Sequence, residues 1–172
     1  MRRLNLRIVR LLTVLVAIGS VLAQRADDPA FLPEALHCES IGLPGGGTTS
    51  YDAKGDSIVK RVTGSKYSKD EVEEEKSRRP STEEWNRFWA TLSQLRVQDW
   101  KNEYSPQQLS PALIIYDGHQ WTFTCRRGDF DVRLSGQNAY PELANPQKTT
   151  RDNAAFSLLT EALENLVNPP AN

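Results

Sequence analysis

The stretch WTFTCRRGDFDVRL, residues 121–134, decides the fold of this 172-residue chain. Apolar and polar residues alternate on both sides of its centre, which is the pattern of two strands that each bury one face. With a four-residue loop from Arg126 to Asp129, apolar residues oppose one another in three pairs: Cys125 with Phe130, Phe123 with Val132, and Trp121 with Leu134. Because a slip of one residue would turn the apolar side chains toward solvent, the pattern predicts an antiparallel hairpin with a well-specified register.

The tip of this hairpin carries the tripeptide Arg127-Gly128-Asp129. One interpretation is an adhesion loop that presents both charges to a receptor. The other is an ordinary turn, because glycine and aspartate are common turn residues and these three residue types meet by chance in many proteins. We therefore treat Arg127, Gly128 and Asp129 as a weak candidate binding loop.

A second hairpin is predicted immediately before the first one. The segment ALIIY, residues 112–116, is followed by Asp117-Gly118, a dipeptide that suits a two-residue type I′ turn. The predicted pairs are Tyr116 with His119 and Ile114 with Trp121. The second half of the chain is thus expected to hold three consecutive strands.

Two amphipathic helices flank these strands. The first begins with a capping box, in which Ser81 caps the helix and Glu84 reaches back to it. Its apolar residues recur at the spacing of one helix face: Trp85, Phe88, Trp89, Leu92 and Leu95. The second helix opens at Asp152 and ends before Pro169, and its apolar face consists of Ala155, Phe156, Leu159, Leu163 and Leu166. Both faces are predicted to lie in the core.

The N-terminal half is predicted to add two strands, residues 35–43 and 57–63. A loop rich in Gly, Ser, Thr and Asp, residues 44–56, separates them. The charged segment 65–79 is interpreted as a connector, with a short helix from Ser68 as the alternative. The element order is therefore β-β-α-β-β-β-α. It predicts a single α+β domain over residues 35–168, with an antiparallel sheet and helices packed on one face.

Residues 1–23 have the features of a secretory signal peptide: a positive start, an apolar run from Leu11 to Ala23, and a short cleavage pattern before Gln24. A retained membrane anchor is the alternative, but a run of about 13 apolar residues is short of the ~20 that span a bilayer. We expect cleavage, a flexible N-terminal arm over residues 24–34, and a secreted protein of the periplasm or the extracellular space. No stable membrane insertion is expected after cleavage.

The charge of the chain excludes some partners. The leader carries four of the 21 basic side chains and none of the 22 acidic ones, so the remaining chain has a net charge of −5. A mildly acidic protein without a basic stripe is a poor ligand for nucleic acid or anionic lipid. Another protein is the more plausible partner.

The only two cysteines are Cys38 and Cys125. A pair of cysteines in an exported protein most often forms a disulfide, which we predict here. One alternative is a reactive thiolate at Cys125, activated by Arg126 and Arg127. The other is a pair of inert buried thiols.

A spaced set of residues marks the second half of the chain: Trp100, Asp117, Gly118, Trp121, Gly136, Asn138, Tyr140 and Pro141. With this pattern, Trp…Asp-Gly-x-x-Trp…Gly-x-Asn-x-Tyr-Pro, residues 80–167 resemble a family of small uncharacterised bacterial domains. The resemblance implies a fold and supplies no activity. Physically these residues are typical of turns, because Gly and Asn tolerate positive φ and the residue before Pro is restricted.

Residues suited to catalysis or metal binding are few. His37 and His119 are the only histidines, and the chain has no Gly-x-Ser-x-Gly elbow. His119, beside a tight turn, is expected to be a solvated turn residue. Metal-ligand spacings such as His-x-x-x-His are missing, and Asp129 with Asp131 would hold a cation only weakly. We predict no catalytic residue, no metal and no cofactor.

These observations favour a secreted, non-enzymatic module that binds another macromolecule or serves as an accessory envelope protein. A small hydrolase or thiol enzyme that uses Cys125 or a histidine is the first alternative. A secreted enzyme inhibitor is the second.

Overall fold

A computed structural model describes residues 31–43, 46–64, 72–112 and 118–170. The described residues from Leu32 onward belong to one compact unit. The expected signal peptide and most of the expected arm lie outside the described residues. The last residues of that arm, Leu32 to Glu34, belong to the compact unit, and Pro33 is buried in it.

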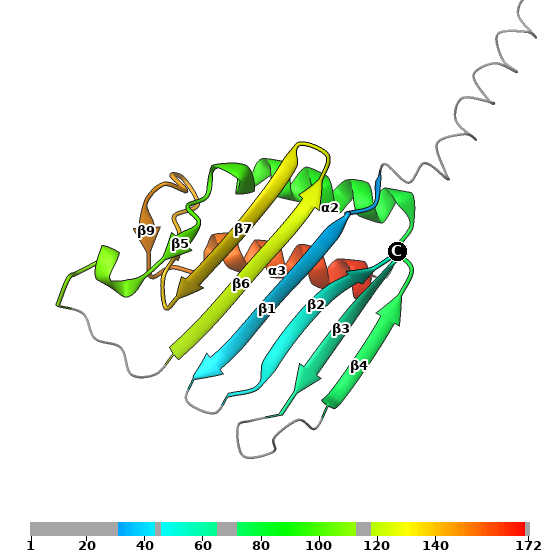
Figure 1. The fold of residues 1–172 in the computed structure, drawn as a ribbon, viewed down its shortest axis with the longest axis horizontal. Helices are drawn as coiled ribbons and strands as arrows, with labels where there is room; N and C mark the ends of the chain where they lie inside the picture. Colours follow the sequence, from blue (N-terminus) through cyan, green and yellow to red (C-terminus); the bar gives the residue numbers. More distant parts are fainter. Residues whose placement is uncertain (1–30, 44–45, 65–71, 113–117, 171–172) are drawn as a thin grey trace, which may run out of the picture. The chain divides into compact units, whose positions relative to one another are not determined.

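The unit is built on a seven-stranded sheet with the order β4-β3-β2-β1-β6-β7-β5 (Figure 1). Neighbouring strands are antiparallel, except that the short β5 runs parallel to β7. β1 lies at the centre and joins an N-terminal meander to the C-terminal hairpin. The strand bounds are β1 Ala35–Leu43, β2 Thr48–Lys54, β3 Ser57–Thr63, β4 Val72–Arg78, β5 Glu103–Tyr104, β6 Gly118–Arg127 and β7 Phe130–Gln137.

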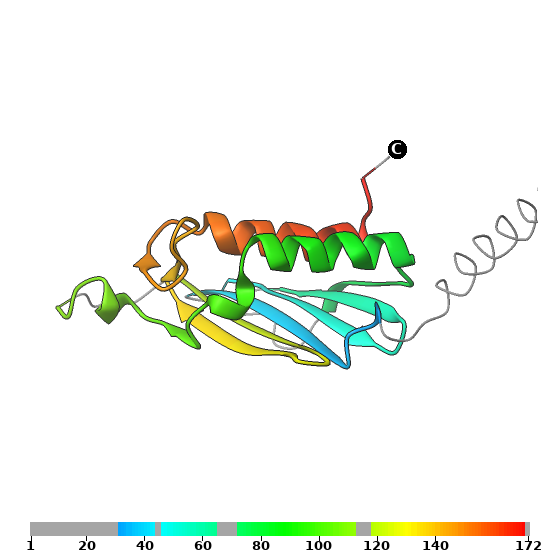
Figure 2. The same ribbon diagram turned by 90° about the horizontal axis from the view of Figure 1, so that it is seen from above.

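Two antiparallel helices cover one face of this sheet, α2 Thr82–Gln94 and α3 Ala154–Val167 (Figure 2). Two short 3-10 helices, η2 Val97–Asp99 and η3 Pro106–Gln108, connect α2 to the C-terminal strands. A small ribbon of β8 Tyr140–Pro141 and β9 Thr149–Thr150 precedes α3. The predicted α+β class, with an antiparallel sheet and helices on one face, is confirmed.

The helices form for the reasons that the sequence indicates. The Ser81 side chain accepts a hydrogen bond from the Glu84 N–H, and the Glu84 carboxylate accepts one from the Ser81 N–H, which completes the predicted capping box. In α3 the whole predicted apolar face is buried. In α2, Trp85, Phe88 and Leu92 are buried, whereas Trp89 is only partly buried at the edge of the core.

Two strands occupy segments that we expected to be irregular. β2 lies within the predicted loop 44–56, and it joins β3 through a two-residue Gly55-Asp56 turn in which Gly55 has a φ of 62°. β4 lies within the predicted connector 65–79. Both predictions were wrong, because pairing with β3 overrides the local preference of polar and charged residues.

The register of the β6–β7 hairpin differs from the prediction by two residues. Gly128 and Asp129 form the turn, Arg127 pairs with Phe130, and the buried partners are Cys125 with Val132, Phe123 with Leu134, and Trp121 with Gly136. A shift of two keeps every side chain on its predicted face, so alternation cannot detect it. The turn sets the register, because Gly128, with a φ of 54°, occupies the position at which a two-residue type II′ turn prefers glycine.

The other predicted hairpin would pair β6 with the segment immediately before it, and the structure gives β6 different partners. Its first strand falls mainly on residues 113–117, which lie outside the described residues. β6 has β1 on one side and β7 on the other, so Trp121 is paired with Ser40 and Gly136 and the predicted Ile114 pairing was wrong.

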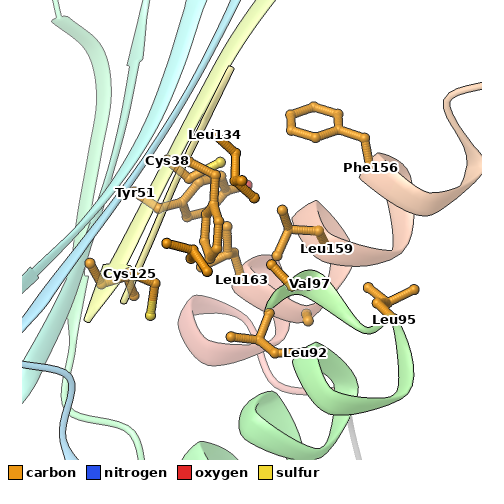
Figure 3. Close-up of a cluster of buried hydrophobic side chains, with 14 of the residues drawn as sticks. Cys38, Tyr51, Leu92, Leu95, Val97, Cys125, Leu134, Phe156, Leu159 and Leu163 are labelled. Atoms are coloured by element: carbon orange, nitrogen blue, oxygen red, sulfur yellow. The ribbon is translucent and has the colours of Figure 1, made fainter. Parts of the chain in front are cut away.

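The core lies between the sheet and the two helices (Figure 3). Its most deeply buried large residues include Trp85, Trp121, Tyr104, Phe88 and Phe123. Aromatic residues dominate the part under β6 and β7, where Trp121 contacts rings from four other elements: Trp100, Tyr104, Tyr140 and Phe156. This packing holds the C-terminal hairpin to the helices.

Candidate functional site

His119 lies at the start of β6 and is hydrogen-bonded through both ring nitrogens. Its Nε2 contacts the Ser40 hydroxyl of β1, and its Nδ1 lies 2.8 Å from the Tyr140 hydroxyl. The ring also stacks on Tyr140 and meets Phe156 edge-on. The expectation of a solvated turn residue was therefore wrong, because the β1–β6 pairing brings Ser40 to His119 from 79 residues away.

The residues of the Trp…Tyr-Pro pattern meet around this histidine. The Asn138 side chain accepts a hydrogen bond from the His119 N–H at 2.6 Å, and the Asn138 N–H returns one to the His119 carbonyl. Gly118 leaves the room for that amide, since a Cβ there would lie 1.8 Å from the Asn138 oxygen. Asn138 itself has a φ of 46°, which Asn tolerates better than most residues.

Trp121 is fixed by the same set of residues. Gly136 lies directly opposite it, and a Cβ there would come within 2.3 Å of the indole nitrogen. That nitrogen donates to the Ala139 carbonyl at 3.2 Å, while Tyr140 stacks on the ring with planes 10° apart. Packing thus accounts for the residue types of five pattern residues: Gly118, Trp121, Gly136, Asn138 and Tyr140. Asp117 lies outside the described residues.

Burial sets the electrostatics of the His119 cluster. It lowers the pKa of His119, so the imidazole is held neutral, and it raises the pKa of Tyr140. A neutral imidazole has one donor and one acceptor, which matches two hydroxyl partners that can each do either. The three side chains therefore satisfy one another without a charge.

The Ser40–His119 contact has the form of a nucleophile and its base, yet its setting disfavours acyl transfer. Ser40 stands in the central strand, paired with Thr49 on one side and Trp121 on the other. Its backbone groups belong to the ladders, whereas an oxyanion hole needs N–H groups that point at the substrate. We interpret the cluster as a structural anchor between β1, β6 and β8.

His37 belongs to a separate network on the other face of the sheet. Its Nδ1 lies 2.8 Å from Asp52, which also pairs with Arg61, and Arg61 in turn pairs with Glu75. These side chains are partly exposed and lie on neighbouring strands, as cross-strand ion pairs on a solvated face do. Cys38, next to His37, points to the opposite face as predicted.

The two cysteines are free thiols in this structure, so the predicted disulfide is not formed (Figure 3). They lie on adjacent strands, but Cys38 is opposite Phe123 and Cys125 is opposite Leu36. Such diagonal neighbours are about 7–8 Å apart, beyond the usual disulfide separation. Burial raises the pKa of both Cys38 and Cys125 to about 12, so neither forms the thiolate that a thiol enzyme needs.

The Arg127-Gly128-Asp129 tip is tied to its surroundings. The Arg127 guanidinium lies 3.9 Å from the centre of the Trp89 ring, as in a cation–π pair. The Gly128 N–H donates to Glu34 at 2.9 Å, and Glu34 also pairs with Arg126. An adhesion loop needs a mobile arginine, and this one is engaged. The same Gly-Asp turn joins β2 to β3, so turn chemistry accounts for it.

The edge of β7 next to this tip lacks a partner strand within the described residues, although η2 packs against β7. In β7, only Ser135 and Gly136 pair with β5. In the described part of the chain, positions 130–134 have a neighbouring strand only on the β6 side (Figure 1). Ser135 donates its N–H away from β6, to Asn102 at 2.9 Å. Because backbone direction alternates along a strand, Asp131 and Arg133 also direct their N–H and C=O groups away from β6. These groups form a template for a further strand.

Aromatic and basic side chains lie beside the open edge. Phe130, the first residue of β7, is partly exposed and packs edge-on against Trp89 at 6.0 Å. The Arg127 guanidinium lies over the face of the Trp89 ring. Trp and Arg are the residue types that most often dominate the binding energy of protein interfaces. We call residues 130–134 with Trp89 and Arg127 the β7 edge site.

A cavity of about 360 Å³ lies between α2 and α3. Its lining mixes polar and apolar groups: Thr91, Gln94, Leu95, Leu158, Glu161, Ala162 and Asn165. No feature of this lining distinguishes one class of ligand.

Within the described part of the chain, no three His, Cys, Asp or Glu side chains converge as a metal site would require. None of the described helices has both the length and the apolar character needed to cross a bilayer. Comparison with known proteins gives no match to a family model, to a curated protein or to a solved structure.

Proposed function

We propose that this protein is a non-enzymatic module that binds an extended segment of protein at the β7 edge site. The observation that carries the proposal is the pair of outward-facing backbone units at Asp131 and Arg133, next to a half-exposed aromatic cluster. Strand addition of this kind takes its affinity from main-chain hydrogen bonds and its specificity from side chains beside them.

The geometry supports a partner strand of about five residues. Two outward-facing residues supply up to four main-chain hydrogen bonds, and β5 limits the edge at Ser135. Phe130 and the Arg127–Trp89 pair would then contact side chains at one end of the bound strand. The His119 cluster and the pattern residues have a structural role in this proposal, because they fix β6 and β7 to the helices.

We also propose that the module acts after export, because residues 1–23 have the sequence of a cleavable leader. Two free thiols do not argue against this, since both are buried and so are protected from oxidants. Mass spectrometry of the protein from its native cell tests the step. An N-terminus at Gln24 supports it, and an intact leader contradicts it.

Site-specific photo-crosslinking tests the binding proposal. A benzophenone amino acid at position 131, in the full chain expressed in its own cell, should give a crosslinked protein adduct. The matched control is position 122 in β6, because Thr122 is also exposed on the outer face but has a strand on each side. Equal adducts from the two positions, or none from position 131, would show that the β7 edge is not the binding surface.

A further inference from the structure

We infer that the strand bound at the β7 edge site is β7 of a second copy of this chain. The two copies pair antiparallel about a twofold axis at Val132, which makes one sheet continuous across the dimer. This inference rests on the proposed function and names the partner of the same site. It is carried by the side chains of β7, which are self-complementary in one register alone.

The backbone restricts the registers that are available. Asp131 and Arg133 direct their N–H and C=O groups to the open edge. In an antiparallel pair, each of them must therefore lie opposite a residue of the partner copy that also faces the edge, which means an odd-numbered residue of β7 or its turn. Three registers centred on the open segment satisfy this condition. They place the twofold axis at Asp131, at Val132 or at Arg133.

Charge distinguishes these three registers. An axis at Asp131 opposes two aspartates, and an axis at Arg133 opposes two arginines, and like charges directly opposite destabilise a sheet. An axis at Val132 opposes Asp131 to the partner copy's Arg133 on both sides of the axis. Both side chains are exposed on the outer face, and no ion pair to another described residue engages either one.

The inner face agrees with the same register. An axis at Val132 places the two valines opposite each other as a non-hydrogen-bonded pair, where side chains approach most closely. It also places Phe130 opposite the partner copy's Leu134, and both residue types are apolar. The partly exposed ring of Phe130 would gain an apolar neighbour there. Opposite charges outside and apolar pairs inside thus follow from one alignment.

Charge reversal of the purified mature chain tests the inference. Sedimentation equilibrium between about 1 µM and 1 mM, the range in which a small interface associates, should show a monomer–dimer equilibrium. Asp131→Arg opposes two arginines on each side of the axis, and Arg133→Asp opposes two aspartates. Each variant should raise the dissociation constant at least ~10-fold, because two attractive pairs become repulsive. Glu39→Arg, an equal charge change in the central strand β1 on the same face, is the control and should leave it unchanged.

A mixture of the two variants gives the sharpest result. The Asp131→Arg chain carries two arginines at these positions and the Arg133→Asp chain carries two aspartates, so each opposes the other favourably. Equimolar mixing should restore dimers that neither variant forms alone. This recovery also shows that both variants are folded. Continued absence of dimers in the mixture, with native circular dichroism for both, would overturn the inference.

A cysteine at the axis reads the register directly. Val132→Cys should give a disulfide-linked dimer on mild oxidation, because the two residues face each other at about 4.5 Å between Cα atoms in a non-hydrogen-bonded pair. Leu134→Cys is the matched control, since it faces Phe130 of the partner copy. A crosslink at 134 and none at 132 would contradict the register.

The two proposals fail differently. If the wild-type chain is monomeric up to about 1 mM but position 131 forms adducts with another protein in cells, the partner is not a second copy and the binding proposal stands. If the chain is monomeric and position 131 forms no adduct, both proposals are wrong. An adduct of two chains, with dimers in solution, supports both.

Discussion

The two edges of the sheet differ in how they meet water. β4 at one edge is paired with β3 along almost its whole length and presents the charged run Glu74-Glu75-Lys76 to solvent. β7 at the other edge leaves five residues open and carries one aspartate and one arginine there. Charged side chains along an edge strand hinder the addition of a second strand. β4 carries more of them than residues 130–134 of β7, which is consistent with the proposal that a partner strand binds at β7.

The support beneath the two edges differs as well. β6 and β7 rest on the aromatic cluster around Trp121, whereas the β3–β4 side is tied to the helices by ionic contacts. Arg78 of β4 donates to both carboxylate oxygens of Glu84 in α2 and to the Leu166 carbonyl in α3. Glu164 of α3 accepts from Tyr51 and Lys60. The following predictions test this difference, from the largest expected effect to the smallest.

Loss of the central aromatic ring should have the largest effect. Trp121→Ala removes a side chain with 1% exposure that four other rings contact, and it should lower the free energy of unfolding by about 3–5 kcal/mol. Chemical denaturation measures this value. Trp89, which is partly exposed, provides the comparison, and Trp89→Ala should lower the free energy of unfolding by less. Equal losses from the two substitutions would mean that the aromatic cluster does not dominate the β7 side.

Removal of the Arg78 side chain should loosen the β4 edge. Arg78→Ala deletes the contact of Nη2 with both carboxylate oxygens of Glu84 and the bond from Nη1 to the Leu166 carbonyl, and it should lower the free energy of unfolding by about 1–3 kcal/mol. Hydrogen exchange should become faster in β4 and stay unchanged in the β7 amides that bond to β6. Faster exchange in β7 with no change in β4 would reverse the assignment.

The two sides should also respond to acid in different pH ranges. Burial lowers the pKa of His119, so its contribution to stability is present above the ordinary value of 6.5 and is lost as the pH falls below it. Burial alone would raise the pKa of Glu84, but hydrogen bonds from Arg78 and Ser81 lower it. Its contribution is therefore lost only as the pH falls below about 4.5. The β7 side should weaken first on acidification.

Denaturation at a series of pH values checks this order. His119→Gln should flatten the dependence between pH 7 and pH 5, and Glu84→Gln should flatten the dependence below about 4.5. Retention of the wild-type slope above pH 5 in the His119 variant would assign that slope to another group.

The smallest effect is expected at the hairpin tip. Arg127→Ala removes the guanidinium from Trp89 and should cost about 0.5–1 kcal/mol. Asp129→Ala changes an exposed turn residue and should stay within about ±0.5 kcal/mol. Thermal melts of the two variants, followed by tryptophan fluorescence, measure the difference. A larger loss at Asp129 would contradict the packing described for the tip.

The sequence predicted those parts of the fold in which local pattern and tertiary environment agree. Both helices, the capping box at Ser81 and the buried faces of β6 and β7 follow from spacing alone. β2 and β4 could not be predicted in this way, because polar edge and outer-face residues do not alternate in hydrophobicity. The register of the hairpin depended on the backbone of Gly128, which the pattern of side chains does not report.

The His119 anchor and the open edge were missed for a different reason. Ser40 and Tyr140 reach His119 from distant parts of the sequence, and only the strand order β1-β6-β7 brings them together. The disulfide prediction was wrong for the same reason. Cys38 and Cys125 are on neighbouring strands, but Cys125 is two residues along β6 from the partner of Cys38. A signal for the open edge was present in Asp131 and Arg133, whose charges alternate on one face.

The central position of β1 has a consequence for synthesis. β1 is made early, but its neighbour β6 emerges only after roughly another eighty residues have been added, as the 79-residue separation of Ser40 and His119 shows. Until then one side of a largely apolar strand has no partner. A nascent chain stalled after β4 should therefore aggregate or recruit a chaperone, and the domain should reach its native state only once β6, β7 and α3, which ends at Val167, have been made.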